Sequence, residues 1–184
     1  MKIIFIGFMG AGKSFFAKRL AERLGIERIG TDELALKKSG RVSIGEIFDK
    51  DNEIKFRELE IETAKELREK DNAIIDAGGG VVENKIILDY LRENGIVVFL
   101  NSSLEIIEKR LKDDGTRPLF KDKEKYRRLY ELRMPLYKEY SDITVGTGGM
   151  IFFSPDETEK LLDNIVEKIK NHTDKPKSTK EEKL

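Results

Sequence analysis

The feature that most constrains this chain is a glycine-rich segment that directly follows an apolar run. Residues 2–6 (KIIFI) form the run, and residues 7–14 read Gly-Phe-Met-Gly-Ala-Gly-Lys-Ser. This segment fits the pattern G-x-x-x-x-G-K-[ST], in which glycines turn backbone N–H groups inward around phosphates and the following helix directs its positive end at them. The order of strand, loop and helix therefore predicts an α/β fold with a nucleoside triphosphate site; the alternative is an ordinary glycine-rich turn that matches by chance.

The residue types in this loop carry the chemistry of phosphate binding. Lys13 is expected to contact the β- and γ-phosphates of ATP, and the Ser14 hydroxyl to ligate Mg²⁺. The other expected ATP contacts are Gly10, Ala11, Gly12 and Phe15. The loop identifies the phosphoryl donor and leaves the acceptor open. The chain has no N-K-x-D guanine signature and is short for a motor ATPase, which favours a small-molecule kinase.

Short apolar runs alternate with amphipathic stretches along the chain, a pattern typical of a parallel sheet covered by helices on both faces. We expect a three-layer P-loop kinase fold with a central five-stranded parallel sheet and a mobile lid. The expected strands are residues 2–6, 26–29, 73–76, 96–100 and 143–145, and the expected helices are 13–24, 52–68, 84–92, 104–111, 123–137 and 155–170.

The 184 residues predict one domain, from 1 to 172, followed by a charged tail at 173–184 that is expected to be disordered. Two segments break the alternation. Residues 40–50 lie inside the long stretch between the second and third strands. Residues 112–124 are polar and contain Gly115 and Pro118 between two helices, which predicts a lid.

Composition excludes several classes of protein. Lys plus Arg equals Asp plus Glu at 35 each, which argues against a protein that binds nucleic acid or a membrane surface. The absence of cysteine excludes disulfides and thiolate zinc sites, and the single histidine, His172, argues against a histidine-built metal site. No apolar run is long enough to span a membrane, and glycines interrupt the first apolar run where a signal peptide would continue. We therefore expect a cytoplasmic protein.

The acceptor side needs an acid–base group and cations. Asp32 follows the second expected strand, at the sheet edge where open α/β folds bind ligands, or it caps the helix that starts there. Arg57 lies on a long charged helix, where it either binds a ligand or pairs with Glu53 and Glu60, four residues before it and three after.

Further candidates lie beyond the third expected strand. The triplet Gly78, Gly79 and Gly80 marks either a close approach of substrate or a flexible turn, since three glycines cost backbone entropy. Arg117 lies in the expected lid. Arg133 lies beside Pro135, which is expected to disrupt its helix. Each arginine is either a ligand contact or a surface charge.

Together these segments resemble the bacterial and plant shikimate kinase family, from residue 1 to about residue 170. The specific part of the resemblance is the spacing of its motifs. They are the loop at 7–14, Phe-Arg-x-x-Glu at 56–60, the glycine triplet at 78–80, Arg-Pro-Leu at 117–119, and Arg-x-Pro-Leu-Tyr at 133–137.

The resemblance implies a monomeric enzyme that uses ATP and Mg²⁺ to convert shikimate to shikimate 3-phosphate in aromatic amino-acid synthesis. By position, it implies that Asp32 binds the ring hydroxyls and acts as a base, and that Arg57 and Arg133 hold the carboxylate. It also implies that Gly79 donates its N–H to the substrate and that Arg117 moves in with the lid to contact the phosphates.

The chain departs from the family pattern at three places. The family has Asp-x-Asp after the second strand, and here the first acid, which reaches Mg²⁺ through water, is Gly30. Ala77 replaces the threonine that usually precedes the glycine triplet. Asp76 closes an apolar strand at a Walker-B-like place, where it either supplies the missing second-shell carboxylate or caps the turn over the glycines. The basic residue that usually contacts adenine has no counterpart in residues 146–154.

Two other functions remain open from the sequence. Another small-metabolite kinase, such as a gluconate kinase, needs the same loop and a lid. A nucleotide-binding module that has lost catalysis would agree with Gly30, but Lys13, Ser14, Asp32 and Arg117 are all present.

Overall fold

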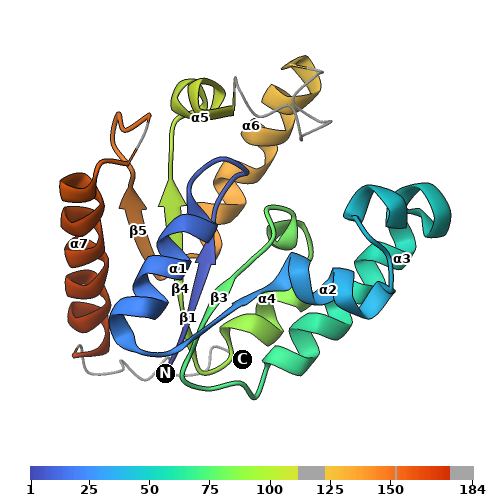
Figure 1. Cartoon of the computed structure of the whole chain (residues 1–184), viewed down its shortest axis with the longest axis horizontal. Helices are drawn as coiled ribbons and strands as arrows, with labels where there is room; N and C mark the ends of the chain where they lie inside the picture. Colours follow the sequence, from blue (N-terminus) through green and yellow to red (C-terminus); the bar gives the residue numbers. More distant parts are fainter. Residues whose placement is uncertain (112–122, 152, 175–184) are drawn as a thin grey trace, which may run out of the picture.

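The computed structural model describes residues 1–111, 123–151 and 153–174 and shows a sheet covered by helices (Figure 1). Within these residues, all strands are parallel and follow the order β2-β3-β1-β4-β5. The strands are β1 (Lys2–Ile6), β2 (Glu27–Gly30), β3 (Ala73–Asp76), β4 (Gly95–Asn101) and β5 (Ile143–Gly146). The predicted five-stranded parallel sheet is confirmed, with β2 displaced by one residue from the expected range.

The helices form a layer on each face of the sheet (Figure 1). Alternate residues of β1 point to opposite faces: Ile4 and Ile6 join the core beneath α3, α4 and α6, whereas Ile3 and Phe5 join the core beneath α1 and α7. The helices are α1 (Lys13–Leu24), α2 (Thr31–Ser39), α3 (Ile44–Leu67), the short 3₁₀ helix η1 (Val81–Glu83), α4 (Lys85–Arg92), α5 (Leu104–Leu111), α6 (Lys123–Tyr140) and α7 (Pro155–Thr173).

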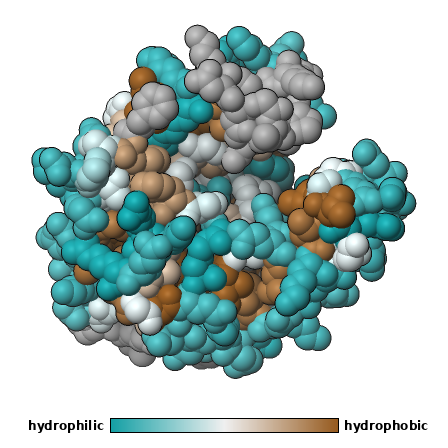
Figure 2. Space-filling view, in the orientation of Figure 1, coloured by the Kyte–Doolittle hydropathy of each residue, from teal (hydrophilic) through white to brown (hydrophobic). Residues whose placement is uncertain are grey.

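The segment between β2 and β3 is more helical than expected. The long helix was expected from Asn52, but α3 begins at Ile44 because Ser43 caps it, its Oγ accepting from the Glu46 N–H at 3.1 Å. Asn52 interrupts α3 with a non-helical φ of 72° and ψ of 171°. Residues from both sides of Asn52 pack with α2 on a small separate core of Ala35, Ile47, Phe56 and Leu59. Figure 2 shows this end projecting from the body with an apolar patch, where Val42 and Ile54 are exposed.

The expectation that Pro135 disrupts its helix is wrong. Helix α6 continues through Pro135 to Tyr140. A proline inside a helix removes one backbone hydrogen bond and strains the preceding turn. Here Pro135 is on the exposed side, while Tyr126, Arg133 and Tyr137 are buried, so packing on the core holds the helix together across the proline.

The C-terminal helix also extends further than expected, to Thr173. Ser154 and Glu157 form a capping box at its start, with Pro155 in the first turn. The rest of the expected disordered tail, residues 175–184, lies outside the described residues, and so do residues 112–122 of the expected lid. In the part of the chain that is described, no helix has the length and apolar character needed to cross a membrane.

Lys2 ties the start of β1 to the end of α3, the helix that carries Arg57. Its fully buried Nζ donates to the carbonyl oxygens of Leu67 at 3.0 Å and Arg68 at 2.8 Å. These carbonyls lie at the helix end, where backbone acceptors lack partners within the helix. Burial lowers the pKa of Lys2 below its usual value, and the charges of Glu93, Glu69 and Asp71 oppose this shift.

We expect Lys2→Met to lower the free energy of unfolding by about 1–3 kcal/mol at neutral pH, because the helix-end carbonyls lose their donor. The difference should widen with rising pH. Between the lowered pKa of Lys2 and its usual value, the unfolded chain binds more protons than the folded one, so wild-type stability gains a contribution that rises with pH. Urea unfolding across an alkaline pH series measures this, with the exposed Lys18→Met as the control. A constant difference across the series would contradict the prediction.

Candidate active site

The carboxyl ends of β1, β2 and β3 meet at one edge of the sheet, above which lies a cavity of about 380 Å³. This is the edge at which open α/β sheets bind ligands. Four segments line the cavity: the loop after β1, the end of β2 with the first turn of α2, the end of β3, and the first two glycines of the triplet, Gly78 and Gly79. The charged and hydroxyl residues in its wall are Lys13, Ser14, Arg28, Asp32, Glu33 and Asp76.

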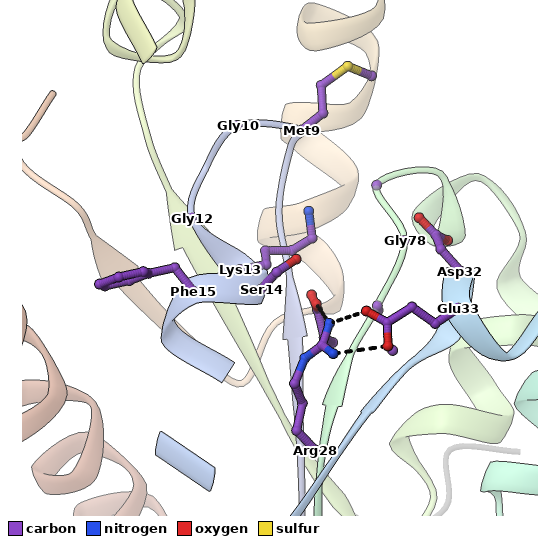
Figure 3. Close-up of a pocket in the computed structure, with 14 residues that line it drawn as sticks. Met9, Gly10, Gly12, Lys13, Ser14, Phe15, Arg28, Asp32, Glu33 and Gly78 are labelled. Atoms are coloured by element: carbon purple, nitrogen blue, oxygen red, sulfur yellow. Dashed lines mark hydrogen bonds and ion pairs between the residues drawn. The ribbon is translucent and has the colours of Figure 1, made fainter. Parts of the chain in front are cut away.

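The loop between β1 and α1 has the backbone that a phosphate cradle needs. Gly10 and Gly12 adopt φ values of 79° and 98°, in the left-handed region that side chains disfavour. The first turn of α1 has no side-chain cap, so its N–H groups are directed at the loop. Lys13 Nζ donates to the carbonyls of Gly7 at 2.9 Å and Phe8 at 3.3 Å. Lys13 and Ser14 both line the cavity (Figure 3).

Asp32 lies directly against the glycine triplet (Figure 3). A Cβ atom added at Gly78 would lie 2.2 Å from Asp32 Oδ1, so the approach of this carboxylate requires glycine there. The neighbouring Thr31 reinforces the contact, since its Oγ1 accepts from the Gly78 N–H at 2.8 Å. Gly30 is the N-cap residue of α2 and Asp32 lies in the first turn, so Asp32 is not the N-cap residue of this helix.

Two arginines converge above the last glycine of the triplet. A Cβ atom at Gly80 would lie 3.1 Å from Arg57 Nη1 and 3.4 Å from Arg133 Nη2. Arg57 also makes the ion pairs expected from its helix spacing, with Glu60 at 2.7 Å and Glu53 at 3.0 Å. These pairs aim its guanidinium at the triplet rather than hold it away from the site.

Arg133 is buried, with 7% of its surface exposed. Its Nη2 donates to a Glu83 carboxylate oxygen at 2.5 Å. One turn further along α6, the Tyr137 hydroxyl donates to the carbonyl of Gly79 at 2.5 Å, and burial raises the pKa of Tyr137 above its usual range. Helix α6 thus holds the triplet through Tyr137.

Glu60, the ion-pair partner of Arg57, is a buried carboxylate. It is 4% exposed, and burial raises its pKa above the usual value, although the Arg57 ion pair opposes the shift. The charge of Asp32 also raises this pKa, and the charge of Arg133 lowers it. The carboxylate and the two arginines therefore interact electrostatically as one group.

Beside Gly30, where the family has its first acid, lies a network of ion pairs that the sequence did not predict. Gly30 is the register partner of Asp76 on the neighbouring strand. Arg28, from β2, pairs with Asp76 at 2.5 Å and with both oxygens of Glu33 at 2.9 and 3.0 Å (Figure 3). Asp76 therefore forms part of the cavity wall. The hydrogen bond to the glycine turn comes from Thr31 and not from Asp76.

A second set of residues missed from the sequence surrounds Arg110, on α5. Its Nη1 donates to the Gly10 carbonyl and its Nε to the Met150 carbonyl, both at 3.0 Å. The guanidinium carbon lies 4.5 Å from the ring centre of Phe153. Phe153 also stacks on Phe15 at 5.1 Å. The segment expected to contact adenine is thus attached to the phosphate loop, and its contact with adenine stays a prediction.

The structure brings together Asp32, Arg57, Arg133 and the glycine triplet, and it places Lys13 and Ser14 in the same cavity wall as Asp32. Arg117 and the rest of the expected lid up to residue 122 lie outside the described residues, so their role also stays a prediction.

The comparison with known proteins gives one family. The family model described as shikimate kinase matches residues 9–174. The shikimate kinase of Caldicellulosiruptor bescii is 45% identical over 139 residues, which cover 74% of this chain and 80% of that protein. The shikimate kinase of Caldicellulosiruptor saccharolyticus is 42% identical over 164 residues, which cover 87% and 92%.

Solved structures agree with the sequence relatives. The shikimate kinase of Acinetobacter baumannii in complex with shikimate superposes with a TM-score of 0.81 at 30% identity and covers 95% of both chains. The enzyme of Aquifex aeolicus superposes with a TM-score of 0.79 at 34% identity and covers 94% of this chain and 98% of that one. On the family match and these identities, together with the site just described, this chain belongs to the shikimate kinase family.

Proposed function

We propose that this protein transfers the γ-phosphoryl group of ATP to a ring hydroxyl of shikimate and releases ADP and shikimate 3-phosphate. The observation that carries the proposal is the meeting of Asp32 with two arginines across the glycine triplet, in front of the phosphate loop. Guanidinium groups recognise a carboxylate by paired hydrogen bonds, while a carboxylate near the phosphates accepts a hydroxyl proton.

On the acceptor side, Arg57 and Arg133 hold the carboxylate of shikimate, and the triplet Gly78, Gly79 and Gly80 lets the ring approach the backbone. Asp32 binds the ring hydroxyls and accepts the proton of the attacking one as the bond to phosphorus forms. Asp32 lies in the first turn of α2, close to the positive end of that helix.

On the donor side, the backbone of the loop from Gly10 to Phe15 surrounds the phosphates. Lys13 exchanges its loop carbonyls for the β- and γ-phosphate oxygens, where its charge stabilises the transferring group. Arg117, from the expected lid, adds a second cation over the same charge and, with the lid, keeps water from competing as the acceptor.

The residues at the loop also fit Mg²⁺. Proteins bind Mg²⁺ with one or two oxygen ligands together with phosphates, so a large cluster of acids is not needed, and the described residues contain none. Ser14 supplies a hydroxyl, and Asp76 ends a buried strand in the same cavity wall, as the Walker-B acid of P-loop enzymes does. Mg²⁺ bound there neutralises charge on the phosphates.

We expect Asp76→Asn to raise the Mg²⁺ concentration for half-maximal activity by about tenfold, because a carboxylate that orients the metal's water ligands is lost. The substitution also breaks the ion pair with Arg28, so Arg28→Met serves as the matched control: it removes the same pair and keeps the acid. Titrating Mg²⁺ at fixed ATP compares the two. An unchanged metal requirement in Asp76→Asn, or an equal change in both variants, removes Asp76 from the metal site.

Shikimate-dependent release of ADP, measured with shikimate against gluconate, tests the function itself. Turnover with shikimate and none with gluconate is expected, and the relatives at 35–45% identity that carry the name shikimate kinase favour this outcome over the gluconate alternative. ATP binding without turnover on either acid would support the catalytically impaired module instead. We also propose that the reaction belongs to aromatic amino-acid synthesis and takes place in the cytoplasm. The enzyme is expected to be a monomer, which light scattering tests, and to bind neither nucleic acid nor membranes.

A further inference from the structure

Glu83 lies in the substrate half of the site, although no motif includes it. It ends η1, immediately after the glycine triplet, and its backbone N–H donates to the carbonyl of Gly80 at 3.0 Å. Its carboxylate would lie 3.6 Å from a Cβ atom at Gly80, in the same small volume as the guanidinium groups of Arg57 and Arg133. The backbone thus fixes an acid at the point where an acidic ligand is expected.

The contact between Glu83 and Arg133 uses only part of the guanidinium. Glu83 accepts from Nη2, whereas the buried Nε of Arg133 has no hydrogen-bond partner among the described residues. A buried N–H without an acceptor costs free energy, and an arginine binds a carboxylate best through two parallel hydrogen bonds. Arg133 therefore retains donor capacity for a second carboxylate while Glu83 occupies one of its nitrogens.

The two arginines of the ligand-free site already have more carboxylate partners than are needed to neutralise them. Glu60 and Glu53 pair with Arg57, and Glu83 pairs with Arg133. A substrate carboxylate that enters this site is a surplus negative charge, so one of the protein's acids must withdraw. Glu60 is 4% exposed, whereas the Glu83 side chain, which pairs with Arg133, is 31% exposed, so Glu83 can exchange its partner for water at lower cost than Glu60.

We propose that the Glu83 carboxylate occupies, in the ligand-free enzyme, the place on Arg133 that the substrate carboxylate takes when it binds. Resting on the proposed function, this assigns Glu83 the task of neutralising Arg133 in the ligand-free enzyme and of giving up that place when an acidic substrate binds. Glu83 is a positioning residue that sets affinity, since it holds Arg133 ready and its charge competes with the substrate. Its removal has opposite effects on the stability of the empty protein and on the affinity for substrate.

The test is Glu83→Gln, which keeps the length of the side chain and removes its charge. We expect the Kd and the KM for shikimate to fall by about threefold to tenfold with kcat nearly unchanged, because the competing charge is gone. The melting temperature of the ligand-free protein should fall, since Arg133 is left buried without a counter-charge, and the rise in melting temperature on adding shikimate should grow. A residue that only braced the fold would not improve binding.

The matched control is Glu58→Gln, which removes a carboxylate on the same helix as Arg57 that pairs with Lys55 instead of an arginine of the site. The Glu58 side chain is 56% exposed, so the Kd of this variant for shikimate should change by less than about twofold. If Glu83→Gln does not fold, Glu83→Asp withdraws the carboxylate from Arg133 by one methylene and should also bind shikimate more tightly than wild type. Equal or weaker binding in the folded variant overturns the proposal. Binding is measured without ATP, so a wild type that binds shikimate without turnover refutes the proposed function alone.

Discussion

Replacing Asp32 with asparagine is expected to lower kcat for shikimate phosphorylation by about 100-fold to 10,000-fold. The amide is nearly isosteric and still hydrogen-bonds to the ring hydroxyls, but it cannot accept the proton of the attacking one. Shikimate binding should therefore weaken far less than kcat falls. Gly30, and not Asp32, is the N-cap residue of α2, and asparagine keeps the size of the side chain, so stability should change little.

Steady-state kinetics together with shikimate-induced thermal shifts measure these two effects separately. The same substitution at the exposed Asp89, which pairs with Lys85 on α4, is the control for a lost carboxylate outside the site. A kcat for Asp32→Asn within tenfold of wild type would show that another group accepts the proton.

Gly78→Ala should impair the enzyme nearly as much, although it adds one methyl group and removes no functional atom. The added Cβ would lie 2.2 Å from Asp32 Oδ1 and 3.0 Å from its Cγ, so the carboxylate must move. A displacement of about 1 Å in a catalytic group can cost about 100-fold in rate. Gly78 does not adopt a left-handed backbone, so alanine is compatible with its φ and the fold should be retained.

Gly45→Ala is the control for this variant, because its Cβ would meet nothing closer than Ser43 Oγ at 3.8 Å. The expected result is a large fall in kcat/KM for Gly78→Ala with a small change in melting temperature, and wild-type values for Gly45→Ala. In the double variant with Asp32→Asn, the two losses should not add, since both act on one carboxylate. Full additivity would mean that Gly78 serves another purpose.

The elements that follow from local pattern were predicted well. The bounds of α1 agree with the sequence because the loop and Gly25 delimit it, and β1 and β3 agree because each is a short apolar run bounded by polar or glycine residues. Pro135 was misjudged because its cost is local, while the packing of Tyr126 and Tyr137 that overcomes it comes from distant strands.

The sequence correctly placed Asp32 and Arg133 beside the glycine triplet, because their residue types and motif spacing pointed to the candidate site. The site was not predictable where the role depends on contact across the fold. Arg28 is an ordinary strand charge in the sequence, and only the pairing of β2 with β3 brings it to Asp76. Arg110 likewise meets Gly10, a residue 100 positions away, through the packing of α5 on the loop.

The pairing of Gly30 with Asp76 makes the order of substitutions matter. The family's acid at position 30 is absent, and the space beside it is now occupied: a Cβ atom there would lie 2.9 Å from Glu33 Cδ and 3.2 Å from Arg28 Nη2. An acid restored at position 30 alone would displace the outer ends of Glu33 and Arg28 and place a further negative charge beside Asp76. We therefore expect the effects of substitutions at positions 30 and 76 to depend on one another.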